Sequence, residues 1–164
     1  MLVRDEKAGD ETAIRNLTQM AFLHAPHSNQ KEADIVDGLR LASALTVSLV
    51  AEEHNDLVGH VAFSPVLING EDLGWYGLGP VSVSPERHGQ RIGSTLIRDG
   101  LSRLQEAGAK GCVLLGDPGY YQRFGFKADD RLKLPGVPAE YFQCLSFNGE
   151  IPIGEVSYHA AFNA

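Results

Sequence analysis

Apolar residues recur along this chain with two different spacings, and the change of spacing separates helices from strands. A spacing of three or four residues, as at Ile14, Leu17 and Ala21, makes one face of a helix apolar. Polar residues suited to N-cap positions precede two such segments, at Asp10 and Asp117. We therefore predict helices over residues 10–22, 30–40, 92–107 and 118–124.

In other segments the apolar residues alternate with polar ones or form short continuous runs, as strands do. The continuous run Cys-Val-Leu-Leu-Gly at 112–116 is typical of a strand buried in a parallel pair. The order of elements, β-α-α-β-β-β-α-β-α-β-β, predicts one α/β domain over residues 1–164 with a mixed sheet. The predicted strands lie within residues 1–6, 46–53, 57–68, 73–83, 112–116, 141–147 and 155–162.

Composition narrows the class of protein. Apolar residues make up 43% and charged residues 21% of 164 positions, as expected of a folded, soluble domain. No apolar run approaches the roughly 20 residues that cross a bilayer. The two cysteines, Cys112 and Cys144, lie in apolar strand-like runs, so we expect buried thiols rather than a disulfide or a nucleophile. These features together favour a cytoplasmic protein.

The net charge of −7 disfavours broad binding to nucleic acid or to an anionic membrane. Any anionic ligand must therefore be held by a local group of residues. The junction at 81–97, Val-Ser-Val-Ser-Pro-Glu-Arg-His-Gly-Gln-Arg-Ile-Gly-Ser-Thr-Leu-Ile, is such a group. It carries an apolar strand into a helix through a loop with basic residues and glycines.

A helix N-terminus has unpaired N–H groups and partial positive charge, and nearby glycines let the backbone approach an anion closely. Gly89 and Gly93 would serve this purpose, while Arg87, His88 and Arg91 add positive potential. The alternative is an ordinary strand-to-helix turn whose charges are solvated. A nucleotide P-loop is excluded because the stretch has no lysine, and the glycine spacing does not fit a dinucleotide fingerprint.

The same junction resembles the acyl-CoA-binding motif of the GNAT superfamily of N-acetyltransferases, whose turn reads Arg/Gln-x-x-Gly-x-Gly/Ala. A later segment, Tyr-Tyr-Gln-Arg-Phe-Gly-Phe at 120–126, resembles the superfamily's Tyr-x-x-x-Gly-Phe signature. The order of elements is similar over nearly the whole chain. The resemblance implies the GNAT fold, with a central mixed sheet of about seven strands and helices on both faces.

The resemblance also implies which residues bind acetyl-CoA. Main-chain groups of two strand residues would hydrogen-bond the pantetheine arm, and backbone N–H groups of the following loop would hold the pyrophosphate. The residues implied in cofactor binding are Val81, Val83, His88, Gly89, Gln90, Arg91, Ile92, Gly93 and Ser94. Arg91 stands where the family has glycine. Because a positive φ is not easily adopted by arginine, we expect the loop to be shaped slightly differently. Its guanidinium could compensate by contacting a phosphate.

Pro80 interrupts the strand that leads into this loop. Because proline cannot donate to a β-ladder, a central strand needs a bulge or a splayed edge at this point. In the family, this strand parts from the next one and the thioester enters the gap. The alternative is a proline on a simple edge strand.

Tyr121 falls on the tyrosine of the Tyr-x-x-x-Gly-Phe signature, the position that the family uses as the general acid. The alternative is a tyrosine that packs through its ring. No residue stands out as the general base. His60 is a possible proton acceptor or a structural histidine, and His24 and His27 lack a third ligand at metal-site spacing, so no metal is expected.

The sequence thus predicts an enzyme that moves the acetyl group of acetyl-CoA to a primary amine, acting as a monomer or homodimer. The rival interpretation is a non-catalytic acyl-CoA-binding sensor or interaction module. A phosphate-binding structural domain without CoA is a third. The identity of the amine is beyond what the residues reveal.

Overall fold

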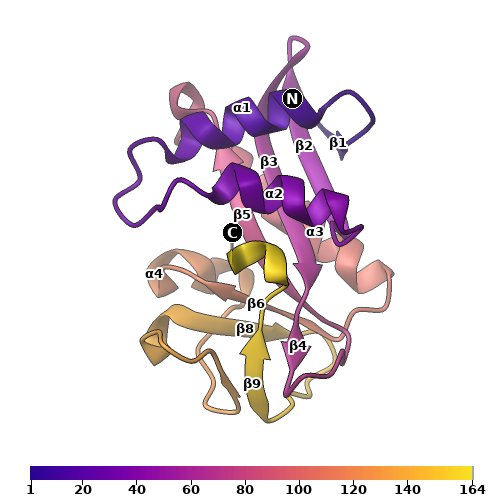
Figure 1. Ribbon diagram of the computed structural model, residues 1–164, viewed down its shortest axis with the longest axis vertical. Coiled ribbons are helices and arrows are strands. Elements are labelled where there is room, and N and C mark those ends of the chain that lie inside the picture. The colour runs from indigo at the N-terminus through magenta and orange to yellow at the C-terminus, as the bar shows by residue number, and fades with distance from the viewer. Residues whose placement is uncertain (164) are drawn as a thin grey trace.

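The computed structural model describes residues 1–163, and a six-stranded sheet runs through its centre (Figure 1). The strand order is β1-β2-β3-β5-β6-β8, and β5 and β6 form the parallel pair of an otherwise antiparallel sheet. This confirms the predicted mixed sheet. The strands are β1 (Leu2–Asp5), β2 (Val47–Glu53), β3 (Asp56–Pro65), β5 (Trp75–Val83), β6 (Gly111–Leu115) and β8 (Phe142–Ser146).

Three short strands form a separate small sheet. The sequence predicted one sheet of about seven strands, and residues 1–163 have nine, six in the central sheet and three in the small one. Their order is β4 (Leu67–Ile68), β9 (Gly154–Ser157) and β7 (Leu132–Lys133). The Val66 N–H still donates to the Trp75 carbonyl of β5 at 3.1 Å, and β4 then leaves the central sheet and pairs with β9. Val156 on β9 then packs into a second apolar cluster under this small sheet.

Helices cover both faces of the central sheet, as predicted (Figure 1). α1 (Glu11–Phe22) and α2 (Glu32–Leu41) lie on one face, and α3 (Ile92–Glu106) lies on the other. Alternating residues of β2 show the division, because Val50 packs with the first pair of helices and Leu49 packs with α3. The main apolar core lies between α3 and the sheet.

The predicted short helix after Asp117 is also present. α4 (Pro118–Tyr121) begins where the Asp117 Oδ1 accepts a hydrogen bond from the Gly119 N–H at 2.9 Å. The helix continues as a single 3₁₀ turn over Gln122–Phe124 and ends at Gly125, whose φ is +97°. Further 3₁₀ turns lie at Pro85–Arg87, Ala139–Tyr141 and Ala160–Asn163.

β5 parts from β6 in the middle of the sheet. The two strands pair over Trp75–Gly77 and Gly111–Val113, and β5 then continues to Val83 beside β3. Opposite β3, two residues of β5, Gly79 and Pro80, stand against the single residue Ala62. The bulge predicted at the proline is therefore confirmed, and the sheet opens into a wedge on its β6 side.

Both cysteines are buried thiols, as the sequence predicted. Burial raises the pKa of the Cys144 thiol to about 11 and raises the pKa of Cys112 as well. Neither sulfur is a thiolate at neutral pH, so neither is an activated nucleophile.

A buried polar chain crosses the α1–α2 face of the sheet at His60. Its Nε2 lies 2.8 Å from the Ser48 Oγ, which donates to Glu6, and Arg40 pairs with Glu6 at 2.7 Å. The His60 side chain is fully buried and its Nδ1 has no partner among the residues the structure describes. His60 is thus a structural histidine that is satisfied at one nitrogen.

This histidine makes stability depend on pH. Burial lowers the pKa of His60 from 6.5 to about 4, and the nearby Glu6 opposes this only partly. The unfolded chain therefore binds one proton more than the folded chain between these values, so stability is complete above about pH 6.5 and is lost as the pH falls. We expect the free energy of unfolding to drop by about 2 kcal/mol from pH 6.5 to pH 5 through this group.

Urea unfolding at several pH values measures the effect. His60→Gln should flatten the dependence in this window and lower stability throughout, whereas His24→Gln, at an exposed position, should leave the dependence unchanged. A dependence that His60→Gln does not alter would contradict the assignment.

Candidate active site

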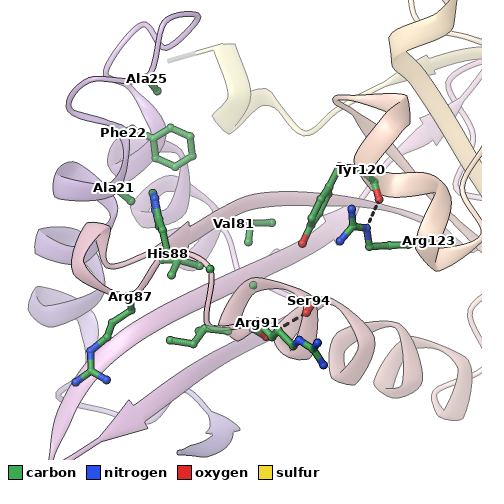
Figure 2. A pocket seen from close by; sticks show the side chains of 14 residues that line it. Ala21, Phe22, Ala25, Val81, Arg87, His88, Arg91, Ser94, Tyr120 and Arg123 are labelled. Atoms are coloured by element: carbon green, nitrogen blue, oxygen red, sulfur yellow. Dashed lines mark hydrogen bonds between the residues drawn. The ribbon is translucent and has the colours of Figure 1, made fainter.

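A cavity of about 450 Å³ lies beside the wedge, between the end of α1, the end of β5, the start of α3 and α4 (Figure 2). In this view Phe22 and His88 approach from one side and Tyr120 and Arg123 from the other, with Val81 at the base. The lining residues are Ala21, Phe22, Ala25, Val81, Val83, Arg87, His88, Gly89, Arg91, Ile92, Gly93, Ser94, Tyr120 and Arg123.

The start of α3 presents unpaired amide groups to this cavity. Within residues 1–163, the N–H groups of Arg91, Ile92, Gly93 and Ser94 donate no hydrogen bond to backbone or side chain. These are the orphan donors of a helix N-terminus, where the helix dipole also places partial positive charge. The geometry suits an anion with several oxygens, such as a pyrophosphate.

Arg91 keeps the left-handed backbone conformation, with φ +63° and ψ +17°. Arginine therefore does not prevent the positive φ that its side chain makes unfavourable. The Arg91 carbonyl accepts hydrogen bonds from the Thr95 N–H at 3.0 Å, the Thr95 Oγ1 at 2.8 Å and the Ser94 Oγ at 3.1 Å. These bonds offset the roughly 1–2 kcal/mol that a left-handed conformation costs a residue with a side chain.

The edge of β5 beside the cavity offers free main-chain groups. The Ser84 N–H donates to the Val58 carbonyl of β3 at 2.9 Å. Because successive backbone groups of a strand point to opposite neighbours, those of Val83 and Val81 are directed away from β3. They face the side where β6 has diverged, and an extended ligand can pair with them there.

Basic side chains gather around the cavity although the chain as a whole is acidic. Arg91 and His88 come from the loop before α3, and Arg123 comes from the turn after α4. The Arg123 guanidinium lies 4.2 Å from the centre of the Tyr120 ring, and its Nε donates to the Tyr120 carbonyl at 2.8 Å. Arg87 is neutralised by an ion pair with Glu53. The guanidinium groups of Arg91 and Arg123 make the cavity electropositive.

The two adjacent tyrosines of α4 have different surroundings. Both are half-buried and pack against the main core, but only Tyr120 lines the cavity. Their ring centroids are 4.9 Å apart and the ring planes are perpendicular. Burial raises the pKa of Tyr121 above its usual value, and the charges of Tyr120 and Asp117 raise it further. The Tyr121 hydroxyl is thus protonated at neutral pH, the state that a general acid needs.

Comparison with known proteins identifies the fold and its chemistry. A family model described as an acetyltransferase (GNAT) domain matches residues 3–128. The chain belongs to the GNAT superfamily of acetyltransferases. In this GNAT domain the wedge, the bulge and the start of α3 all fall within the matched residues.

Two relatives extend over nearly the whole chain. An uncharacterized N-acetyltransferase of Escherichia coli, YhbS, is 37% identical over 99% of both chains. A crystal structure of YhbS in complex with CoA has a TM-score of 0.88 and 36% identity, covering 99% of this chain and 92% of that one. A GNAT acetyltransferase from Brucella melitensis, solved in complex with acetyl-CoA, is 57% identical with a TM-score of 0.89, covering 98% and 97% of the two chains.

The GNAT motif residues predicted from the sequence come together in space. Eight of the nine predicted cofactor-binding residues line the cavity, and the exception is Gln90. The predicted acid, Tyr121, lies outside the lining. Sequence reasoning missed Tyr120 and Arg123, although their spacing of three residues on a short helix would have placed them on one face.

The described part of this GNAT domain has neither a cluster of metal-binding side chains nor a helix suited to crossing a membrane. Residues 1–163 contain no cluster of three histidine, cysteine or carboxylate side chains that could hold a metal ion. Over the same residues, no helix has the length and hydropathy of a membrane span.

Proposed function

We propose that the protein transfers the acetyl group of acetyl-CoA to a primary amine, and that the 450 Å³ cavity holds the cofactor. One observation carries this proposal: the free main-chain edge of β5 leads directly to the unpaired N–H groups at the start of α3. Pantetheine and pyrophosphate need these two surfaces in this order. Relatives with 57% and 36% identity have been solved with acetyl-CoA and with CoA.

Each part of the cofactor has residues suited to it. The amides of the pantetheine arm would pair with the main chains of Val81 and Val83, as an added strand does. The pyrophosphate would lie on the backbone between Gly89 and Ser94, with the guanidinium of Arg91 and that of Arg123 beside it. The thioester would then lie in the wedge between β5 and β6.

The reaction needs positioning and proton transfer rather than a covalent intermediate on the enzyme. A neutral amine attacks the thioester carbonyl, a carbon–nitrogen bond forms, and the carbon–sulfur bond breaks. A free N–H of β5 beside the wedge would stabilise the oxyanion. The Tyr121 hydroxyl would give its proton to the departing thiolate, and the amine proton would leave to water or a base.

Calorimetry with CoA, pantetheine and ATP tests the cofactor site. We expect CoA to bind far more tightly than pantetheine, because pantetheine lacks the phosphates that the start of α3 would hold. Equal affinity for the two would overturn the phosphate assignment. Release of CoA from acetyl-CoA on addition of amines then separates the enzyme from the non-catalytic binding module, which would bind CoA and release none.

Arg91→Gly tests the role of the guanidinium apart from that of the loop. Glycine adopts the φ of +63° without steric cost, so the fold should be kept and the Tm should change by only a few degrees. Loss of a charge-assisted contact to phosphate should weaken CoA binding about tenfold. Pantetheine affinity is the matched control and should not change. A CoA affinity equal to that of the wild type would show that Arg91 serves the loop alone.

A further inference from the structure

A second cavity, of about 660 Å³, lies at the segment that leads from β6 into α4. Its wall includes Leu115, Gly116 and Asp117, the residues that carry the chain from β6 into α4. The 3₁₀ turn before β8 contributes Tyr141, and the loop between α1 and α2 contributes His27. Of these residues only Asp117 bears on the chemistry described above, because its charge raises the pKa of Tyr121.

The cavity is joined to the proposed reaction centre through Gly116. A Cβ atom on this glycine would lie 2.6 Å from a ring carbon of Tyr121, so the tyrosine ring packs directly against it. The Gly116 backbone is fixed on both sides, since its N–H donates to the Tyr141 carbonyl at 2.9 Å and its carbonyl accepts from the Gln143 side chain at 3.0 Å. The hydrogen bonds of Gly116 therefore fix the position of this part of the cavity wall against the Tyr121 ring.

The loop between α1 and α2 contributes to both cavities. Ala25 lines the cofactor cavity, and His27, two residues later, lines the second one. In Figure 1 this loop and α4 lie on the same side of the molecule. The two cavities are therefore adjacent parts of one active-site region.

The lining of the second cavity is mostly apolar, with one carboxylate, that of Asp117, and one imidazole, that of His27. Leu115 and Tyr141 are 50% and 45% exposed, which is high for side chains of this size, and Val137 and Pro138 extend the apolar surface. Asp117 is the carboxylate of the wall, and its Oδ1 is used by the Gly119 N–H. Its other oxygen can accept a hydrogen bond from an ammonium group.

We propose that this cavity binds the acceptor, and that the acceptor is a small primary amine with an apolar side group, such as an arylalkylamine. This inference rests on the proposed acetyl transfer and adds the class of amine. The apolar group would lie on Leu115 and Tyr141, and the ammonium would lie near Asp117 before it loses its proton and attacks. A polyamine would leave its further charges on an apolar surface, which is unfavourable.

Calorimetry of 2-phenylethylamine, ethylamine and spermidine against the protein saturated with CoA tests this class without relying on turnover. We expect 2-phenylethylamine to bind at least about tenfold more tightly than ethylamine, because its ring leaves water for the apolar wall. Tighter binding of spermidine or ethylamine would overturn the apolar assignment. So would no binding of 2-phenylethylamine, and CoA binding measured in the same samples would still report on the cofactor site.

Two substitutions locate the amine. Asp117→Asn keeps a side-chain oxygen for the helix cap and removes the charge, and Leu115→Gln makes the wall polar. Each should weaken 2-phenylethylamine about tenfold and leave CoA affinity unchanged. Leu41→Gln, at a position 88% exposed on α2, is the matched control. If both cavity variants bind 2-phenylethylamine as the wild type does, the amine binds elsewhere and the proposal is wrong.

Discussion

Replacing Tyr121 with phenylalanine should lower kcat by roughly 10²–10⁴-fold and leave acetyl-CoA affinity nearly unchanged. The substitution removes one hydroxyl and keeps the ring. The centroid of this ring lies 6.4 Å from that of the Phe126 ring, and the ring also packs against Gly116. The fold should therefore be retained. What is lost is the proton that the thiolate would accept, and this loss affects the chemical step rather than binding.

Tyr120→Phe is the matched control for this prediction. Tyr120 stands next to Tyr121 on the same short helix, has the same functional group, and lines the cofactor cavity. Removing the Tyr120 hydroxyl should lower kcat much less than removing the Tyr121 hydroxyl does, and it should change mainly the affinity for the cofactor.

Single-turnover measurements across pH, with an amine whose chemistry is rate-limiting, distinguish the two tyrosines. The raised pKa of Tyr121 means that the wild type keeps its acid protonated through neutral pH. A near-normal kcat in Tyr121→Phe at every pH would show that solvent protonates the thiolate and that Tyr121 only packs.

The helices and long strands were predictable because each repeats its apolar spacing over many residues. α3 shows this best, with Ile92, Leu96, Leu101 and Leu104 all buried on one face. The division of the sheet was not predictable, because β4 and β7 have two residues each and a two-residue strand has no period. Their pairing with β9 depends on contacts between segments far apart in the sequence.

The parts of the candidate site that bind through backbone N–H groups were predictable from the sequence. The parts that depend on where a side chain points were less predictable. The phosphate-binding loop can be located from the local sequence alone, because its glycines lie next to the predicted start of a helix. The left-handed Arg91 depends on hydrogen bonds from Ser94 and Thr95, which no local preference of arginine indicates. Which of the two tyrosines lines the cavity depends on how α4 packs, and it is Tyr120 that does so.

Gly93→Val should weaken CoA binding by at least about 100-fold while the protein remains folded. Gly93 is the second residue of α3, and a Cβ there would meet Val83 at 3.4 Å and the Tyr120 hydroxyl at 4.0 Å, both ordinary contacts. The protein interior therefore has no need of glycine at this position. The valine methyl groups would instead enter the space in front of the unpaired N–H groups and separate the phosphates from them.

A β-branched residue costs a helix only tenths of a kcal/mol, so the loss of helix propensity is a small effect. Ser102→Val, at an exposed position of the same helix, is the matched control for it and should keep full CoA affinity. Thermal unfolding and calorimetry on both variants separate the two effects. A collapse of the Tm in Gly93→Val, with normal CoA binding by the protein that remains folded, would mean that this glycine is required for packing and that the phosphates bind elsewhere.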